Sequence, residues 1–352
     1  MEPASLIEII TLQYNNLTIC LSMSKKLYST QKWKNYLKSR QRYQLRRTRE
    51  RGRRRREVIP LTRTRFRHLP FATLAVPSSF SIIQNPNETI AFLREFRYVA
   101  QRNNLTLDLA ATTCITIDAI TVLIAEILRL GGTRLVNGSL PRNESCRDLL
   151  IQSGFFDHVR SRNPLPPGKK GKISPRKSNQ VEGDTAKELI RIGSEAAFGS
   201  PRKCRGAYSA LVECMSNTHN HATGKREAHG AETWYLTVYG DALDGSVRYT
   251  FLDTGVGIFR SVRLNNLKKA YNRFFKGEDH RHILKDILEG KVASRTGLPF
   301  RGKGLPGIYK SFLAGRIKSL IIISNDVYAN VASGDYRILG TQFPGTLVYW
   351  ES

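Results

Sequence analysis

The chain has 352 residues, with 56 Lys and Arg against 29 Asp and Glu, and a formal net charge of +27. An apolar share of 40% is large enough to build buried cores, so the composition excludes a wholly disordered chain. No stretch approaches the roughly 18 uncharged apolar residues of a membrane span, and the start lacks the basic region of a signal peptide. Five scattered cysteines without a CxxC pair predict neither a disulfide scaffold nor a cysteine zinc site, so we expect a cytoplasmic protein.

Residues 1–70 are expected to form a flexible basic arm. Residues 24–70 contain 18 Lys and Arg but two Glu, so they carry +16 of the net charge. Charges this dense repel one another and keep a segment extended, while Arg-rich segments neutralise phosphates and often fold on RNA or DNA. We therefore predict contact with RNA, DNA or another polyanion, the alternative being a solvated tail. The arginines of the densest part are Arg46, Arg47, Arg49, Arg51, Arg53, Arg54, Arg55 and Arg56.

Residues 71–160 alternate between strand and helix patterns. This order predicts a small layered α/β domain. Strands are expected at 71–83, with a bend at Val76-Pro77, at 105–109 and at 133–136. Helices are expected from a cap at Asn87 or Thr89 to Ala100, at 117–130 before Gly131-Gly132, and at 144–150.

Part of this domain resembles the STAS-like fold of anti-sigma antagonists. The resemblance is carried by Leu107-Asp108-Leu109, by the helix start at Ile117-Asp118, and by the closing segment 147–156. In that family a Ser or Thr just after the Asp is phosphorylated, whereas Ala119-Ile120 stand here. The resemblance therefore implies a structural role or the docking of a protein partner. A phosphorylation switch would fall to Thr116 or Thr121.

Residues 161–183 are rich in Pro, Gly and Lys and have no apolar periodicity, so we expect a linker or mobile loop. From Asp184 the pattern reads as two helices, two strands, a long irregular insert, a further helix and closing strands. Within the insert, two short basic helices are expected at 265–275 and 279–288, followed by a flexible stretch at 294–299.

Three clusters of this second half carry the chemistry. Glu213, Asn217 and His221 are four residues apart, so a helix places them on one face. Asp253 ends an apolar strand before a turn with two glycines, where its carboxylate can accept from an exocyclic amine while the backbone passes close to a ligand. The segment 300–307 reads as a glycine-rich loop that runs into a helix at 308–313, which is typical of a phosphate cradle.

In this order the clusters resemble the N, G1 and G2 boxes of the Bergerat-fold ATPases, the GHKL superfamily, over 184–352. The closing segments 319–324 and 345–349 look like that fold's last strands, and His221-Ala222 is closest to the anti-sigma and histidine-kinase branches. The resemblance implies ATP and Mg²⁺ as ligands and the insert as a lid. It implies that Glu213 orients or deprotonates the nucleophile, Asn217 coordinates Mg²⁺ and Asp253 accepts from the adenine amine. The other implied nucleotide contacts are Gly255, Gly257, Gly302, Lys303, Gly304, Gly307 and Thr346.

The expected fold class is therefore α/β and α+β, with a small STAS-like βαβ domain followed by a Bergerat-fold α/β sandwich. The favoured function is Mg-dependent ATP hydrolysis that drives lid closure and a conformational or partner switch, in a bacterial regulatory or phage-defence setting. One alternative is an anti-sigma-type serine/threonine protein kinase. A second is a non-catalytic, nucleotide-sensing module that binds nucleic acid. A homodimer is a further expectation from the superfamily.

Overall fold

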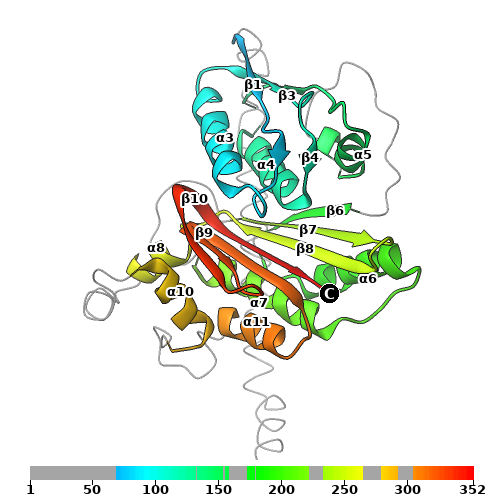
Figure 1. The fold of residues 1–352 in the computed structure, drawn as a ribbon, viewed down its shortest axis with the longest axis vertical. Helices are drawn as coiled ribbons and strands as arrows, with labels where there is room; N and C mark the ends of the chain where they lie inside the picture. Colours follow the sequence, from blue (N-terminus) through cyan, green and yellow to red (C-terminus); the bar gives the residue numbers. More distant parts are fainter. Residues whose placement is uncertain are drawn as a thin grey trace, which may run out of the picture. The chain divides into compact units, whose positions relative to one another are not determined.

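The computed structural model describes residues 69–131, 133–153, 155–157, 173–178, 180–221, 233–264, 279–291 and 304–352 (Figure 1). These residues all belong to one compact unit, Phe66–Ser352. The fold is mixed α/β with both parallel and antiparallel sheets, which confirms the expected class at that level. The arginines of the expected arm, Gly302, Lys303, and the segments 265–275 and 294–299 lie outside the described residues.

The first half of the unit is built on parallel strands. β1, β3 and β5 form a three-stranded sheet, and β2 pairs with β4. The order of strands and helices follows the sequence prediction, except that β4 was not predicted and that β5 begins at Val136, where the predicted strand 133–136 ends. The elements are β1 (Phe71–Ala75), β2 (Ser79–Phe80), α3 (Pro86–Val99), β3 (Asn104–Asp108), β4 (Cys114–Ile115), α4 (Ile117–Arg129), β5 (Val136–Gly138), α5 (Glu144–Gln152) and the 3₁₀ turn η1 (Phe155–Asp157).

Two further details of this half differ from the prediction. The strand 71–83 is interrupted at Val76-Pro77, where an edge or a bend was expected because proline has no N–H for a strand ladder, but its second part ends at Phe80 rather than at residue 83. Helix α3 begins at Pro86 and has Asn85 at its N-cap, so the predicted cap at Asn87 or Thr89 is wrong. Proline suits the first helical position, where the missing N–H has no intrahelical partner in any case.

The second half is built on a five-stranded antiparallel sheet with the order β6-β7-β8-β10-β9. The edge strand β6 lies inside the segment that the sequence indicated as a linker or loop. The prediction failed there because Pro175 and flanking basic residues hide the pattern, and an edge strand tolerates a proline. The strands are β6 (Ile173–Ser178), β7 (Trp234–Asp241), β8 (Ser246–Asp253), β9 (Lys318–Asn330) and β10 (Asp335–Glu351).

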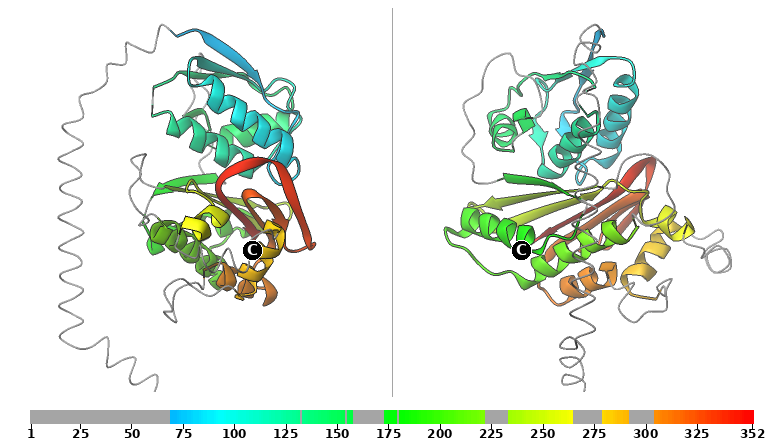
Figure 2. Two further views of the ribbon diagram at one scale, coloured as in Figure 1. Left: turned by 90° about the vertical axis from the view of Figure 1, so that its left-hand side faces the viewer. Right: turned by 180° about the vertical axis from the view of Figure 1, so that it is seen from behind.

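Helices cover one face of this sheet (Figure 2). α6 (Gly183–Phe198), α7 (Arg205–His221) and α11 (Gly304–Leu313) pack there and bury Trp234, Phe251 and Trp350. The insert contributes α8 (Ile258–Leu264) and α10 (His280–Leu288), the second of which was predicted. Within the described part of the chain, none of the helices combines the length and apolarity needed to cross a membrane.

The opposite face of the sheet is also buried, because it shares a core with α3 and α4. Tyr235, Leu252 and Leu347 belong to the same apolar cluster as the buried residues of the first half. The hydroxyls of Thr121 on α4 and Thr237 on β7 are hydrogen-bonded at 2.8 Å inside this core. Burial, followed by the charge of Glu126, raises the pKa of Tyr235 to about 12. The strands around Leu252 are therefore apolar on both faces.

Replacing Thr121 with Val should destabilise the protein by about 1–3 kcal/mol, because it leaves the buried Thr237 hydroxyl without its partner. Thr237→Val should cost less, since Thr121 keeps its bond to the Ile117 carbonyl at 2.7 Å. Urea denaturation of both variants and of the double variant checks this, and a double variant as costly as the two single changes together would contradict it. Thr250→Val is the control, because that buried hydroxyl has no hydrogen-bond partner in the described structure.

Candidate functional site

Two of the predicted site residues lie one turn apart on α7 and face the start of α11. A Cβ atom added to Gly304 would clash with the Asn217 side chain, and one added to Gly307 would lie 3.9 Å from Glu213 Oε1. The described first turn of α11 therefore lies against Asn217 and Glu213, and a side chain at position 304 would require the Asn217 amide to shift. The described part of α11 begins at Gly304, four residues before the predicted start of the helix.

The polar side-chain groups of Glu213 and Asn217 are not paired with other described residues. The Glu213 carboxylate and the Asn217 amide are half-buried, and neither has a hydrogen-bond or ion-pair partner among the described residues. Partial burial raises the pKa of the Glu213 carboxyl. The third residue of the predicted face, His221, lies in the last turn of α7, and its side chain is outside the described part. Within the described part of the chain, the polar groups of Glu213 and Asn217 are therefore not paired.

A row of side chains crosses the end of the sheet. The row contains one residue from each of four neighbouring strands, and each residue lies directly opposite the next. Its members are Trp234 of β7, Asp253 of β8, Thr346 of β10 and Ser324 of β9. Residues directly opposite in an antiparallel sheet project to the same face. Asp253 and Thr346, both predicted as site residues, are therefore neighbours on one face of the sheet.

That face is the one covered by α7 and α11. Phe251 and Val348, two residues along from Asp253 and Thr346, belong to the core beneath these helices. The buried Cys214 of α7 confirms the proximity: burial raises the pKa of its thiol most, and the charges of Glu213 and Asp253 raise it further. The helix carboxylate and the strand carboxylate are thus both near enough to the Cys214 thiol for their charges to act on it, so the first two predicted clusters lie in one region of the fold.

The turn after β8 holds the Asp253 carboxylate in place. Its Oδ1 accepts from the Gly255 N–H at 2.8 Å, and Thr254 Oγ1 donates to the Thr233 carbonyl at 2.8 Å. Gly257 has φ +84°, and the Asn325 side chain occupies the place of a Cβ atom there, so a larger residue would be strained and obstructed. The two predicted glycines therefore shape this turn.

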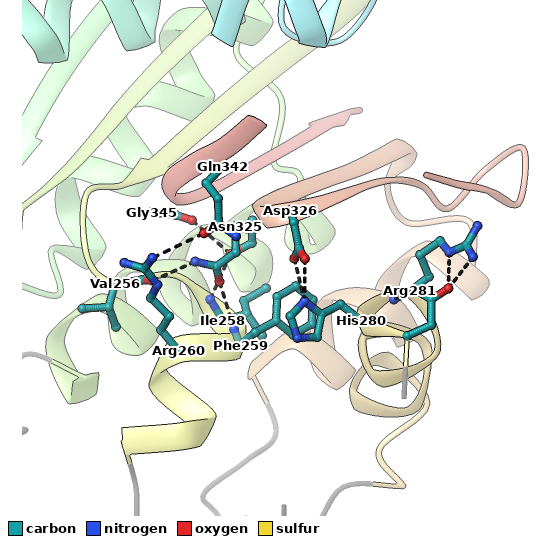
Figure 3. A network of polar contacts seen from close by, with 12 residues as sticks. Val256, Ile258, Phe259, Arg260, His280, Arg281, Asn325, Asp326, Gln342 and Gly345 are labelled. Carbon is teal, nitrogen blue, oxygen red and sulfur yellow. Dashed lines mark hydrogen bonds and ion pairs between the residues drawn. The ribbon is translucent and has the colours of Figure 1, made fainter. Parts of the chain in front are cut away.

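Three consecutive residues of β9 bind the turn and the insert, and Figure 3 shows the contacts of two of them, Asn325 and Asp326. Ser324 Oγ accepts from the Ile258 N–H at 2.9 Å. Asn325 Nδ2 donates to the Val256 carbonyl at 3.0 Å, and its Oδ1 accepts from the Phe259 N–H at 3.1 Å. Asp326 lies 2.6 Å from Nδ1 of His280 at the start of α10.

The His280 ring is fixed on its other side as well. It stacks on Phe259 of α8, with ring centroids 4.4 Å apart and ring planes at 4°. Helices α8 and α10 are therefore attached both to β9 and to each other. The sequence analysis missed Ser324, Asn325 and Asp326. The available signal was three polar residues within an otherwise apolar strand, of which Ser324 and Asn325 are buried.

The residues at the expected phosphorylation position are inaccessible. Ala119 and Ile120 are fully buried in α4, and the Thr121 hydroxyl is bonded to Ile117 and Thr237. Asp118 is also buried; it accepts from the Ile82 N–H at 2.7 Å, and burial raises its carboxyl pKa. This part of α4 packs into the core and does not present an accessible hydroxyl that could accept a phosphoryl group.

Among the residues that the structure describes, no three His, Cys, Asp or Glu side chains gather into a metal-binding group. A scan against protein-family models found no match to the chain, and a search of the curated proteins found none. The function is therefore inferred from the chemistry of the site itself.

Proposed function

We propose that the chain binds Mg-ATP and hydrolyses it, with residues 184–352 as a Bergerat-type ATPase domain and 71–160 as a STAS-like domain. The observation that carries this proposal is the convergence of three elements: Asp253 at the end of β8, Glu213 and Asn217 on α7, and the glycine-containing first turn of α11. These are the residues of the three sequence clusters, brought together from separate parts of the chain.

The strand side of the site suits a purine base. Asp253 and Thr346 lie side by side, and a carboxylate held by its own turn is a fixed acceptor for an exocyclic amine. Trp234, next in the row, supplies an apolar wall. Pockets for small molecules combine such apolar walls with a few fixed polar groups.

The helix side suits phosphates. A helix start has backbone N–H groups without intrahelical partners and favours negative charge, so the described first turn of α11, from Gly304, would suit phosphate groups. The Glu213 carboxylate, partly withdrawn from water, would orient the attacking water and accept its proton.

Magnesium fits the same place. Mg²⁺ usually takes one or two protein oxygens and completes its shell with phosphates and water, so the Asn217 amide oxygen, which has no partner among the described residues, would suffice as a ligand. Bound there, Mg²⁺ would neutralise charge on the phosphates.

The two-sided burial of the sheet supports a conformational switch. Asp253 faces the site, while the adjacent Leu252 packs in the core that contains α3 and α4. Helices α8 and α10 of the insert are hydrogen-bonded to β9 beside the glycine turn. If the insert closed over a nucleotide, it would therefore move elements that contact the strand residues proposed to bind the purine. Binding energy at the site can in this way reach the STAS-like domain.

The test is the fate of the γ-phosphate. The purified full chain should release free phosphate from γ-labelled ATP with Mg²⁺, and EDTA should stop the release. Label retained on protein would instead favour the kinase alternative. ATP binding without turnover would favour the sensor alternative, and an effect of added RNA or DNA would favour contact through the basic arm. Absence of ATP binding would overturn the proposal.

A further inference from the structure

Ser324 belongs to the row of strand residues that is proposed to bind the purine base, but the sequence did not predict it as a nucleotide contact. Its side chain is fully buried, and its hydroxyl has three neighbours within hydrogen-bond distance. These are the Ile258 N–H at 2.9 Å, the Gly345 carbonyl at 3.0 Å and the Thr346 hydroxyl at 3.0 Å. Thr346 is the neighbour of Asp253 in the row, so Ser324 acts directly on one wall of the proposed pocket.

Counting protons fixes the direction of each bond. A hydroxyl has one proton to donate and can accept two hydrogen bonds. The Ile258 N–H can only donate and the Gly345 carbonyl can only accept, so Ser324 spends its proton on Gly345. The remaining contact must then use the proton of Thr346. Thr346 Oγ1 is left with lone pairs alone to present to a ligand.

We infer that Ser324 determines base specificity by positioning Thr346 as a hydrogen-bond acceptor. This inference rests on the proposed function. With Thr346 so oriented, both polar groups in that part of the row, Asp253 and Thr346, are acceptors. They accept from the 6-amine of adenine and oppose the 6-carbonyl of hypoxanthine or guanine. A buried acceptor that meets another acceptor loses its hydrogen bond and stays desolvated.

The experiment compares Mg-ATP and Mg-ITP binding to the full chain by calorimetry. ITP differs from ATP by a carbonyl in place of the 6-amine and by a proton on N1, so the group at position 6 changes from a donor to an acceptor. The wild-type chain should bind ATP about 100-fold more tightly than ITP. Ser324→Ala should reduce this ratio about tenfold, because the Thr346 proton is released and can turn to the carbonyl. Thr346→Val should reduce it similarly, and the double variant should add nothing further.

Ser194→Ala is the matched control. Ser194 is also a buried serine that accepts from a backbone N–H, of Arg202 at 2.8 Å, and donates to a backbone carbonyl, of Arg191 at 3.0 Å. It belongs to α6 and should lose stability without any change in the ATP/ITP ratio.

Each outcome is decisive. An unchanged ratio in folded Ser324→Ala, or a further drop in the double variant, would overturn the role of Ser324. If Ser324→Ala does not fold, an unchanged ratio in Thr346→Val still overturns the inference, because that variant removes the Thr346 hydroxyl and keeps the bonds of Ser324 with the Ile258 N–H and the Gly345 carbonyl. A wild-type chain that binds neither nucleotide overturns the proposed function itself, before any variant is made.

Discussion

Asp253→Asn should weaken ATP binding by about 100-fold, because the variant loses a hydrogen bond to a charged group and places a donor where an acceptor is needed. One Asp253 oxygen accepts from the Gly255 N–H at 2.8 Å. An Asn in this turn would keep its single carbonyl oxygen toward that N–H and turn its NH₂ toward the base. A donor would then face the amine of adenine. Titration calorimetry measures the change in Kd.

The control for this variant is Asp244→Asn, at the other end of β8. Asp244 also accepts from the N–H two residues further on, Ser246, at 3.0 Å, so the chemical change and this hydrogen bond are the same, while its other oxygen is paired with Arg248. It should leave the Kd for ATP unchanged. Equal Kd values for wild type and Asp253→Asn would remove Asp253 from the base pocket.

Glu213→Gln should lower ATP turnover by about 100-fold or more while the Kd for ATP changes less than about threefold. General-base catalysis contributes about 10²–10⁴-fold, and an amide of the same shape cannot accept the proton. Single-turnover phosphate release measures the effect. Glu195→Gln, a half-exposed glutamate of α6 paired with Arg191, is the control and should keep full turnover. Loss of binding and turnover together would make Glu213 a binding group instead.

The raised pKa of Glu213 predicts how activity depends on pH. The carboxyl must be ionised to accept a proton, so turnover should rise with pH through a pKa above that of an ordinary glutamate. In Glu213→Gln this acidic limb should be absent from the residual rate. A wild-type limb at the usual glutamate pKa would contradict the assignment.

Stability should move in the opposite sense to activity. Because burial raises the folded-state pKa of Glu213, the folded state binds the proton more tightly than the unfolded state. Stability is then full below the unfolded-state pKa and falls as pH rises through the folded-state pKa. At neutral pH, Glu213→Gln should therefore be more stable than the wild type, and the difference should vanish in acid.

Local patterns sufficed for much of the fold and of the site. The helical spacing of Glu213 and Asn217 and the Asp-Gly turn at 253–257 predicted which face and which turn carry polar groups, because those patterns are set within one element. Contacts between elements that are distant in the sequence could not be predicted from such local patterns. Asn325 contacts Gly257 from 68 positions away, and Gly304 of α11 lies against the Asn217 side chain of α7. Nothing in the sequence near either residue encodes its partner.

Successive side chains of β8 point to opposite faces of the sheet, so this strand is more sensitive to an inserted or deleted residue than to a substitution. Leu252 belongs to one core and Asp253 to the opposite face, so a single inserted or deleted residue within β8 would exchange their sides. A carboxylate would enter an apolar core while a leucine took its place in the site. Turns such as 242–245, exposed to water, impose no such parity and can change in length. Natural variation in chain length is therefore expected at the turns and excluded from β8.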